Sequence, residues 1–171
     1  MNDITIYHPW DMAGVDGLVA ARALFGESVD YLAPFQSMET VLGGEACSVL
    51  RLCDRNFRIT YPGPLDQILS ELKLQLWVKQ LEWMRAVVLP VDCLPAIAAQ
   101  ATTKAPHRLQ PLPLHCAAPA QINPIPALLW HHPIDNWPTL EVHLAYRQIA
   151  EFWDRIQSPT YSSVSLTTAH T

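Results

Sequence analysis

The sequence lacks long apolar runs, a basic N-terminus and any C-x-x-C spacing. No apolar run approaches the roughly 20 residues that a membrane-spanning helix needs. The first three residues carry no positive charge of the kind that begins a secretory signal peptide. The spacing of the four cysteines argues against a zinc ribbon or a dithiol redox motif. These absences predict a cytoplasmic protein with free thiols and no membrane association.

Positive charge is also scarce. The chain has 11 Lys and Arg residues against 16 Asp and Glu residues, which gives a net charge of −5. A broad nucleic-acid surface is usually basic, so an extended surface of that kind is not expected. A small nucleotide held through metal ions stays possible. With 171 residues, half of them hydrophobic, the chain has the size of one domain with a real core.

Hydrophobic spacing predicts strands and helices in alternation along the chain. Strands are expected over residues 3–8, 29–35, 47–53 and 86–91, and helices over residues 14–25, 65–84, 127–132 and 140–156. A turn is expected at Gly43-Gly44. Alternation of this kind is typical of an α/β fold, with a mostly parallel sheet and helices on both faces. The prediction is a single domain over residues 1–157, with a Pro-rich irregular connection at 95–126 and a disordered tail at 158–171.

Acidic residues follow three of these predicted strands. Asp11 and Asp16, with His8, come after the first strand, and Asp54 and Asp92 end two others. Parallel strands place their carboxyl ends at one sheet edge, so these side chains could converge. Convergent carboxylates need a cation, and a two-metal phosphoester site would supply one. The alternative is that each Asp caps a helix or a turn, which is common.

The same stretches resemble the small DHH phosphoesterases. Ile6-Tyr7-His8, followed by Asp16-Gly17 and an Ala-rich helix, resembles the first motif of that family. The strand that ends at Asp54 resembles the second motif, and Glu151-Phe152-Trp153 resembles the closing segment. The resemblance implies a DHH-like core, Mn²⁺ or Mg²⁺ as cofactor, and His8, Asp16, Asp54 and Asp92 as metal ligands, with Asp92 also catalytic.

The chain departs from this family at the motif that names it. Asp92-Cys93-Leu94 stands where Asp-His-His is expected, and the first motif is stretched around Asp11. Asp11 and Cys93 are possible substitute ligands, and Glu151 would lie in the outer part of the site. His131-His132 could replace the missing pair or serve in packing.

Two functions therefore stay open. One is a metal-dependent phosphoesterase that acts on a nucleotide or oligonucleotide phosphate, with an impaired third motif. The other is an inactive pseudo-phosphoesterase that serves as a binding or scaffold subunit. Trp77 falls off the main apolar stripe of its predicted helix, so an exposed patch for a protein partner is plausible.

Overall fold

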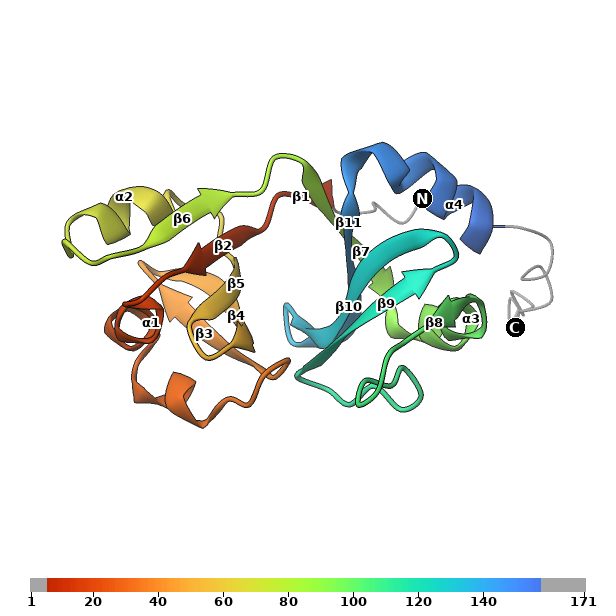
Figure 1. Ribbon diagram of the computed structural model, residues 1–171, viewed down its shortest axis with the longest axis horizontal. Coiled ribbons are helices and arrows are strands. Elements are labelled where there is room, and N and C mark those ends of the chain that lie inside the picture. The colour runs from red at the N-terminus through yellow and green to blue at the C-terminus, as the bar shows by residue number, and fades with distance from the viewer. Residues whose placement is uncertain (1–5, 158–171) are drawn as a thin grey trace, which may run out of the picture.

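A computed structural model describes residues 6–157 and shows two β-sheets side by side, with helices at the outer ends (Figure 1). The six-stranded sheet has the order β1-β7-β11-β10-β9-β8. Its strands are β1 (Ile6–Tyr7), β7 (Met84–Pro90), β11 (Trp137–Ala145), β10 (Ile125–Ile134), β9 (Cys116–Ile122) and β8 (Ala101–Thr102). The five-stranded sheet has the order β3-β4-β5-β2-β6. Its strands are β3 (Ser37–Leu42), β4 (Glu45–Cys53), β5 (Asn56–Thr60), β2 (Trp10–Ala13) and β6 (Trp77–Gln80).

Each sheet has its own outer hydrophobic core, formed against helices. On the five-stranded sheet, α1 (Gly17–Phe25) and α2 (Leu65–Ser70) cover a core that contains Met12, Val49 and Phe57. On the six-stranded sheet, α3 (Leu94–Gln100) and α4 (Ile149–Ile156) cover a core that contains Leu129 and Val142. Three short 3₁₀ helices complete the elements: Glu27–Tyr31, Val91–Cys93 and Tyr146–Gln148. None of the helices within residues 6–157 is long and apolar enough to cross a membrane.

Tight hairpins connect four of the neighbouring strand pairs within residues 6–157. Gly43-Gly44 joins β3 to β4 with φ values of 59° and 85°. Asp135-Asn136 joins β10 to β11 with φ values of 50° and 67°. Positive φ at both central positions is the mark of a type I′ turn, whose twist matches that of the flanking strands. The turn predicted at Gly43-Gly44 is therefore confirmed, and the second turn places the β10–β11 hairpin beside the five-stranded sheet (Figure 1).

The inner faces of the two sheets meet through a small apolar cluster. Leu50 of β4 packs with Ala117 of β9 and with Leu128 and Trp130 of β10. The indole Nε1 of Trp130 donates a hydrogen bond of 2.9 Å to Ser37 Oγ at the start of β3. This cluster fills only part of the inner faces, and buried polar side chains, among them Arg58, His132, Glu141 and His143, lie beside it.

The predicted fold class is wrong, because every strand pair within residues 6–157 is antiparallel. Three predicted helices are also wrong or too long. Residues 127–132 lie in β10, residues 140–145 lie in β11, and the helix predicted at 65–84 is only α2, followed by β6. The strand predicted at 29–35 overlaps a 3₁₀ helix instead.

The error at β11 has a clear physical cause. Leu140, Val142 and Leu144 face the outer core, while Glu141 and His143 face the other sheet. That alternation has a period of two, which is the period of a strand. The helical prediction joined these residues to the real helix α4 and so missed the change of period.

Other predicted elements are confirmed. The helix predicted at 14–25 is α1, which Gly26 follows with a φ of 85°, and the strands predicted at 47–53 and 86–91 are β4 and β7. The Pro-rich stretch 95–126 contains α3, β8 and β9 as well as irregular chain. The tail predicted to be disordered, residues 158–171, lies outside the described residues.

Candidate functional site between the two sheets

A buried carboxylate, Glu141, is the centre of the polar part of the interface between the sheets. It lies on β11, and its side chain has no exposed surface. Its Oε1 accepts hydrogen bonds from Tyr7 Oη and His143 Nε2, and its Oε2 accepts one of 2.8 Å from His132 Nε2. A buried charge is stable only when it is paired and hydrogen-bonded, and these three donors meet that need.

His143 links Glu141 to the five-stranded sheet. Arg58 of β5 donates a hydrogen bond of 3.4 Å from Nη1 to His143 Nδ1, and it also forms two bonds of 2.8 and 3.0 Å to the carboxylate of Asp11 on β2. A guanidinium can only donate, so His143 Nδ1 must be an acceptor and Nε2 must carry the proton. The geometry thus fixes His143 as a neutral imidazole that donates to Glu141.

His132 of β10 lies between two carboxylates, one from each sheet. Its Nε2 bonds Glu141, and its Nδ1 lies 3.4 Å from Oε1 of Glu39 on β3 without good hydrogen-bond geometry. The ring of Trp130 stacks on its ring, with centroids 3.8 Å apart and an angle of 18° between the planes. The second oxygen of Glu39 accepts a hydrogen bond from Ser48 Oγ of β4.

The pKa values of His132 and Glu141 are shifted in opposite directions. Burial by itself would lower the pKa of His132, but its hydrogen bond to the Glu141 carboxylate and the nearby negative charge of Glu39 outweigh burial and raise the pKa to about 9. Burial would raise the pKa of Glu141, yet His143 and His132 lower it to about 2. Burial lowers the pKa of His143, and burial also raises the pKa of Tyr7 well above its usual range. At neutral pH the pair is therefore a Glu141 carboxylate and a His132 imidazolium, with His143 and Tyr7 neutral.

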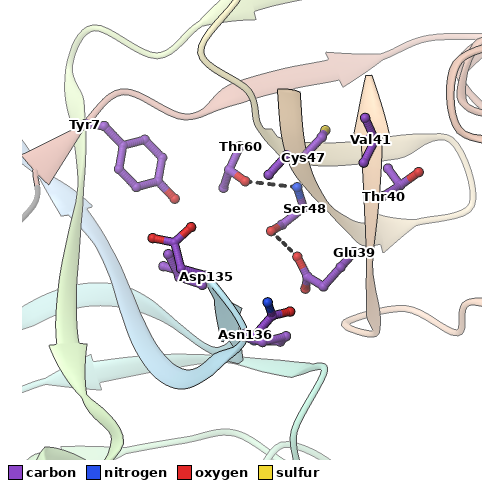
Figure 2. A pocket seen from close by; sticks show the side chains of 12 residues that line it. Tyr7, Glu39, Thr40, Val41, Cys47, Ser48, Thr60, Asp135 and Asn136 are labelled. Carbon is purple, nitrogen blue, oxygen red and sulfur yellow. Dashed lines mark hydrogen bonds between the residues drawn. The ribbon is translucent and has the colours of Figure 1, made fainter. Parts of the chain in front are cut away.

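A cavity of about 480 Å³ opens beside this network. Its wall includes Tyr7, Glu39 and Ser48 from the network, with Asp135 from the β10–β11 turn (Figure 2). Figure 2 shows the side chains of Tyr7, Ser48 and Asp135 around the same space, with Ser48 bonded to Glu39. The rest of the wall is uncharged: Thr40, Val41, Ala46, Cys47, Thr60, Pro133, Ile134 and Asn136. This size suits a small molecule.

The charges of the network do not balance among its own members. Asp11, Glu39 and Glu141 supply three carboxylates, while Arg58 and the His132 imidazolium supply two cations. The surplus negative charge falls on Glu39, at the cavity wall, and Asp135 adds a second carboxylate there. None of the residues that line the cavity is Lys, Arg or His. The site can therefore attract a cation and repel an anion.

The residues expected to bind metal lie apart from one another. His8 precedes β2, where its Nδ1 lies 2.9 Å from Arg85 Nη1 and 3.2 Å from the carbonyl oxygen of Leu81. Asp16 precedes α1, and its Oδ2 accepts a hydrogen bond of 2.8 Å from the backbone of Gln75. His8 and Asp16 therefore each interact with neighbouring segments of the protein, and not with one another.

Asp54 lies exposed in the turn between β4 and β5 of the five-stranded sheet, whereas Asp92 and Cys93 follow β7 of the six-stranded sheet. Asp92 and Cys93 lie in the 3₁₀ helix after β7, where burial and Asp92 raise the pKa of the Cys93 thiol. Glu151 on α4 pairs with Arg155 at 3.0 Å. Within residues 6–157 no group of three or more His, Cys, Asp or Glu side chains could hold a metal ion. The need for Mn²⁺ or Mg²⁺ stays a prediction without a ligand set in this part of the chain.

One pair of expected ligands does belong to neighbouring segments. A Cβ on Gly17 would lie 2.0 Å from the carbonyl oxygen of Arg55, so only glycine lets α1 begin this close to the β4–β5 turn. Asp16 precedes Gly17 in the chain, and Asp54 precedes Arg55. The Asp-Gly signal is explained here by close packing.

Of the expected ligands, only Asp11 belongs to the network between the sheets. The pair His131-His132 was predicted either to replace the missing histidines or to serve in packing, and Glu39, Glu141, His143 and Arg58 were not predicted. One available signal was the run from Leu140 to Leu144, in which Glu141 and His143 alternate with apolar residues. Polar residues that alternate inside an apolar strand face a second surface, and they need partners there.

Comparisons with known proteins bear on the fold. No protein-family model matches the chain, and no curated protein sequence matches it. Among solved structures, the chain is similar to the glycine cleavage system aminomethyltransferase T from Bartonella henselae. The TM-score is 0.67 at 14% sequence identity, over 91% of this chain and 44% of that one. The chain thus spans less than half of the length of that protein.

This likeness overturns the resemblance to the DHH phosphoesterases. The two antiparallel sheets match an aminomethyltransferase structure, and nothing in the arrangement corresponds to the mostly parallel sheet that a DHH-like core requires. The motifs that carried the resemblance lie on elements of other kinds. The second motif lies in the β4–β5 hairpin, and Asp92 lies in a 3₁₀ helix after an antiparallel strand. The chain has the fold of part of an aminomethyltransferase.

Proposed function

We propose that this chain is a small-molecule-binding protein whose ligand is a compact organic cation, held in the cavity between the two sheets. The observation that carries the proposal is the composition of the cavity wall, where Glu39 and Asp135 are the charged residues. A protonated amine or a guanidinium would balance the surplus charge on Glu39 and could donate hydrogen bonds to it. A phosphate group would meet two carboxylates and no cation from the wall, so a phosphoester is not the favoured ligand.

The structural neighbour supports this proposal indirectly. Its name refers to an aminomethyltransferase, so an amine is part of the chemistry that its name describes. The present chain spans 44% of that protein, and we propose for it binding without a reaction of its own. Its four cysteines are free, which supports a reducing, cytoplasmic location as part of the same proposal.

Calorimetric titration tests this function. Methylguanidinium is a suitable probe, because its charge is constant over the working pH range, and acetate is the matched anion. We expect methylguanidinium to bind and acetate not to bind. Glu39→Gln should weaken binding by roughly tenfold, or about 1.4 kcal/mol. Glu45→Gln is the matched control, because Glu45 is exposed on β4 and does not line the cavity. Equal binding to the two variants, or binding of acetate, would contradict the proposal.

A second candidate function is that of a subunit that contacts a protein partner through Trp77. The side chain of Trp77 is 51% exposed and lies on β6, the outer strand of the five-stranded sheet. An exposed aromatic residue on a strand edge is typical of a contact surface. Co-purification from the native cells tests it: Trp77→Ser should lose a partner that Tyr31→Ser keeps, since Tyr31 is exposed on a 3₁₀ helix elsewhere.

A further inference from the structure

The position of His132 between two carboxylates suggests a role at the cavity. Glu39 lines the cavity, and its Oε1 lies 3.4 Å from His132 Nδ1. His132 is fully buried behind it and is held from the other side by Glu141. The Glu39 carboxylate is thus the anionic neighbour of His132 Nδ1 and also one of the two carboxylates that a cation in the cavity would meet.

We propose that His132 is a positioning residue for Glu39, and that a cation in the cavity competes with it for Glu39 Oε1, so that ligand binding releases a proton from His132. The inference rests on the proposed function. The proton that leaves is the one on Nδ1, and it passes to the solvent buffer. His132 keeps its Nε2 proton and its hydrogen bond to Glu141, and no other bond changes.

The polar groups around His132 allow this exchange. Its partners come from several elements: Glu141 and His143 from β11, Glu39 from β3, Tyr7 from β1, and Arg58 through His143 from β5. His143 is fixed as a neutral donor by Arg58, and Tyr7 is a neutral donor, so neither can supply the proton in place of His132. His115 Nδ1 lies 3.8 Å from Glu39 Oε1, but its side chain is 44% exposed and its interaction is screened by solvent.

The neutral form of His132 is tolerated because of the stacking and the remaining bond. Trp130 covers one face of the ring whatever its charge. The hydrogen bond of 2.8 Å from Nε2 to Glu141 is kept in both forms. Nδ1 has no well-oriented hydrogen bond even now, so the loss of its proton breaks no strong bond.

Titration with methylguanidinium in two buffers of different ionisation enthalpy tests the proton release. Near pH 8.5 we expect roughly half a proton to be released for each ligand bound. Affinity should rise severalfold between pH 7 and pH 9, because the competing proton leaves. His132→Gln should bind with no proton release and with an affinity that does not change with pH. His131→Gln is the control and should behave as the parent, since His131 bonds the carbonyl oxygen of Leu112.

A second measurement covers the case in which His132→Gln does not fold. The ring C–H signals of His132 can be titrated by NMR in the parent protein, in Glu39→Gln and in Glu45→Gln. Glu39→Gln should lower the midpoint of His132 by about one pH unit, and Glu45→Gln should leave it unchanged. An unchanged midpoint in Glu39→Gln would overturn the positioning role.

The two proposals fail in different ways. Binding of methylguanidinium without any proton exchange would overturn the competition at Glu39 and leave the proposed function standing. No binding at any pH would overturn the proposed function and the ligand-linked proton release together. In that case, a His132 midpoint that depends on Glu39 would still support the positioning role.

Discussion

The outer cores and the interface between the two sheets are built from different residues. The outer cores are apolar on both sheets, and residues such as Leu129 and Phe57 pack there against helices. The inner interface combines four buried apolar residues with a chain of charged ones that runs from Asp11 to Glu39. Apolar burial stabilises the fold without regard to direction, whereas buried charges need particular partners. The interface, more than the outer cores, is therefore where this molecule carries chemistry.

Glu141→Gln should have the largest effect. The change leaves the His132 imidazolium buried without its principal counter-charge, and removal of one partner from a buried pair costs about 3–5 kcal/mol. The free energy of unfolding, measured in urea at pH 7, should fall by that amount. Glu151→Gln is the control, since its pair with Arg155 is on the surface, and it should cost under about 0.5 kcal/mol. A similar loss for both variants would show that the interface charges are no different from surface charges.

Leu129→Ala tests the outer core in the same assay. Leu129 is fully buried between β10 and the helices, and a Leu→Ala change in such a core costs about 2–5 kcal/mol. The cost should be the same at pH 6 and pH 9, because no titrating group is involved. Leu72→Ala, at a partly exposed position, should cost clearly less. A cost for Leu129→Ala that varies with pH would break the distinction between the two regions.

Stability should depend on pH through the interface. The pKa of His132 is raised from 6.5 to about 9 on folding, so its contribution is complete below pH 6.5 and is lost as the pH rises through 9. The pKa of His143 is lowered from 6.5, so its contribution is lost as the pH falls below 6.5. The pKa of Glu141 is lowered from 4.5 to about 2, so its contribution to stability is lost as the pH falls from 4.5 to about 2.

Urea unfolding at a series of pH values should therefore give a maximum near pH 6.5, with a loss of at most about 3 kcal/mol by pH 9. The shifts of His132 and Glu141 describe one shared interaction, so their contributions are not added. In Glu141→Gln the decline above pH 6.5 should flatten. A parent protein whose stability is constant from pH 6 to pH 9 would contradict the charged state of His132.

Ser37→Ala should have a smaller effect on the apolar part of the interface. It removes the acceptor for the indole of Trp130, a bond of 2.9 Å in a buried place. A buried donor left without a partner costs about 1–3 kcal/mol. Thermal unfolding should show a lower midpoint for this variant than for Ser70→Ala, whose hydroxyl bonds locally at the surface. Equal midpoints would mean that the indole finds another partner.

Local signals in the sequence were sufficient for several elements but for little of the site, of which only Asp11 and His132 were candidates. Gly43-Gly44, the spacing over α1 and the apolar run of β7 predicted a turn, a helix and a strand correctly. Each of these depends on residues close in the chain. The helix predicted over residues 140–156 was wrong in its first part. A strand with a period of two is followed there by a helix with a period of 3.6, and no glycine or proline between them marks the boundary.

What the sequence by itself determined is the apolar content, the acidic net charge and the short-range turns. The tertiary structure alone decided which strands pair, that they pair antiparallel, and that Glu39 meets His132 across 93 positions of chain. Pairing between distant strands depends on the sum of many side-chain contacts, and no single residue encodes it. The position of a carboxylate in the sequence does not show which face of a sheet it will occupy. Pairing of β1, β10 and β11 within one sheet gave Glu141 its three donors, and the packing of the two sheets brought Glu39 to His132 and left the surplus charge at the cavity.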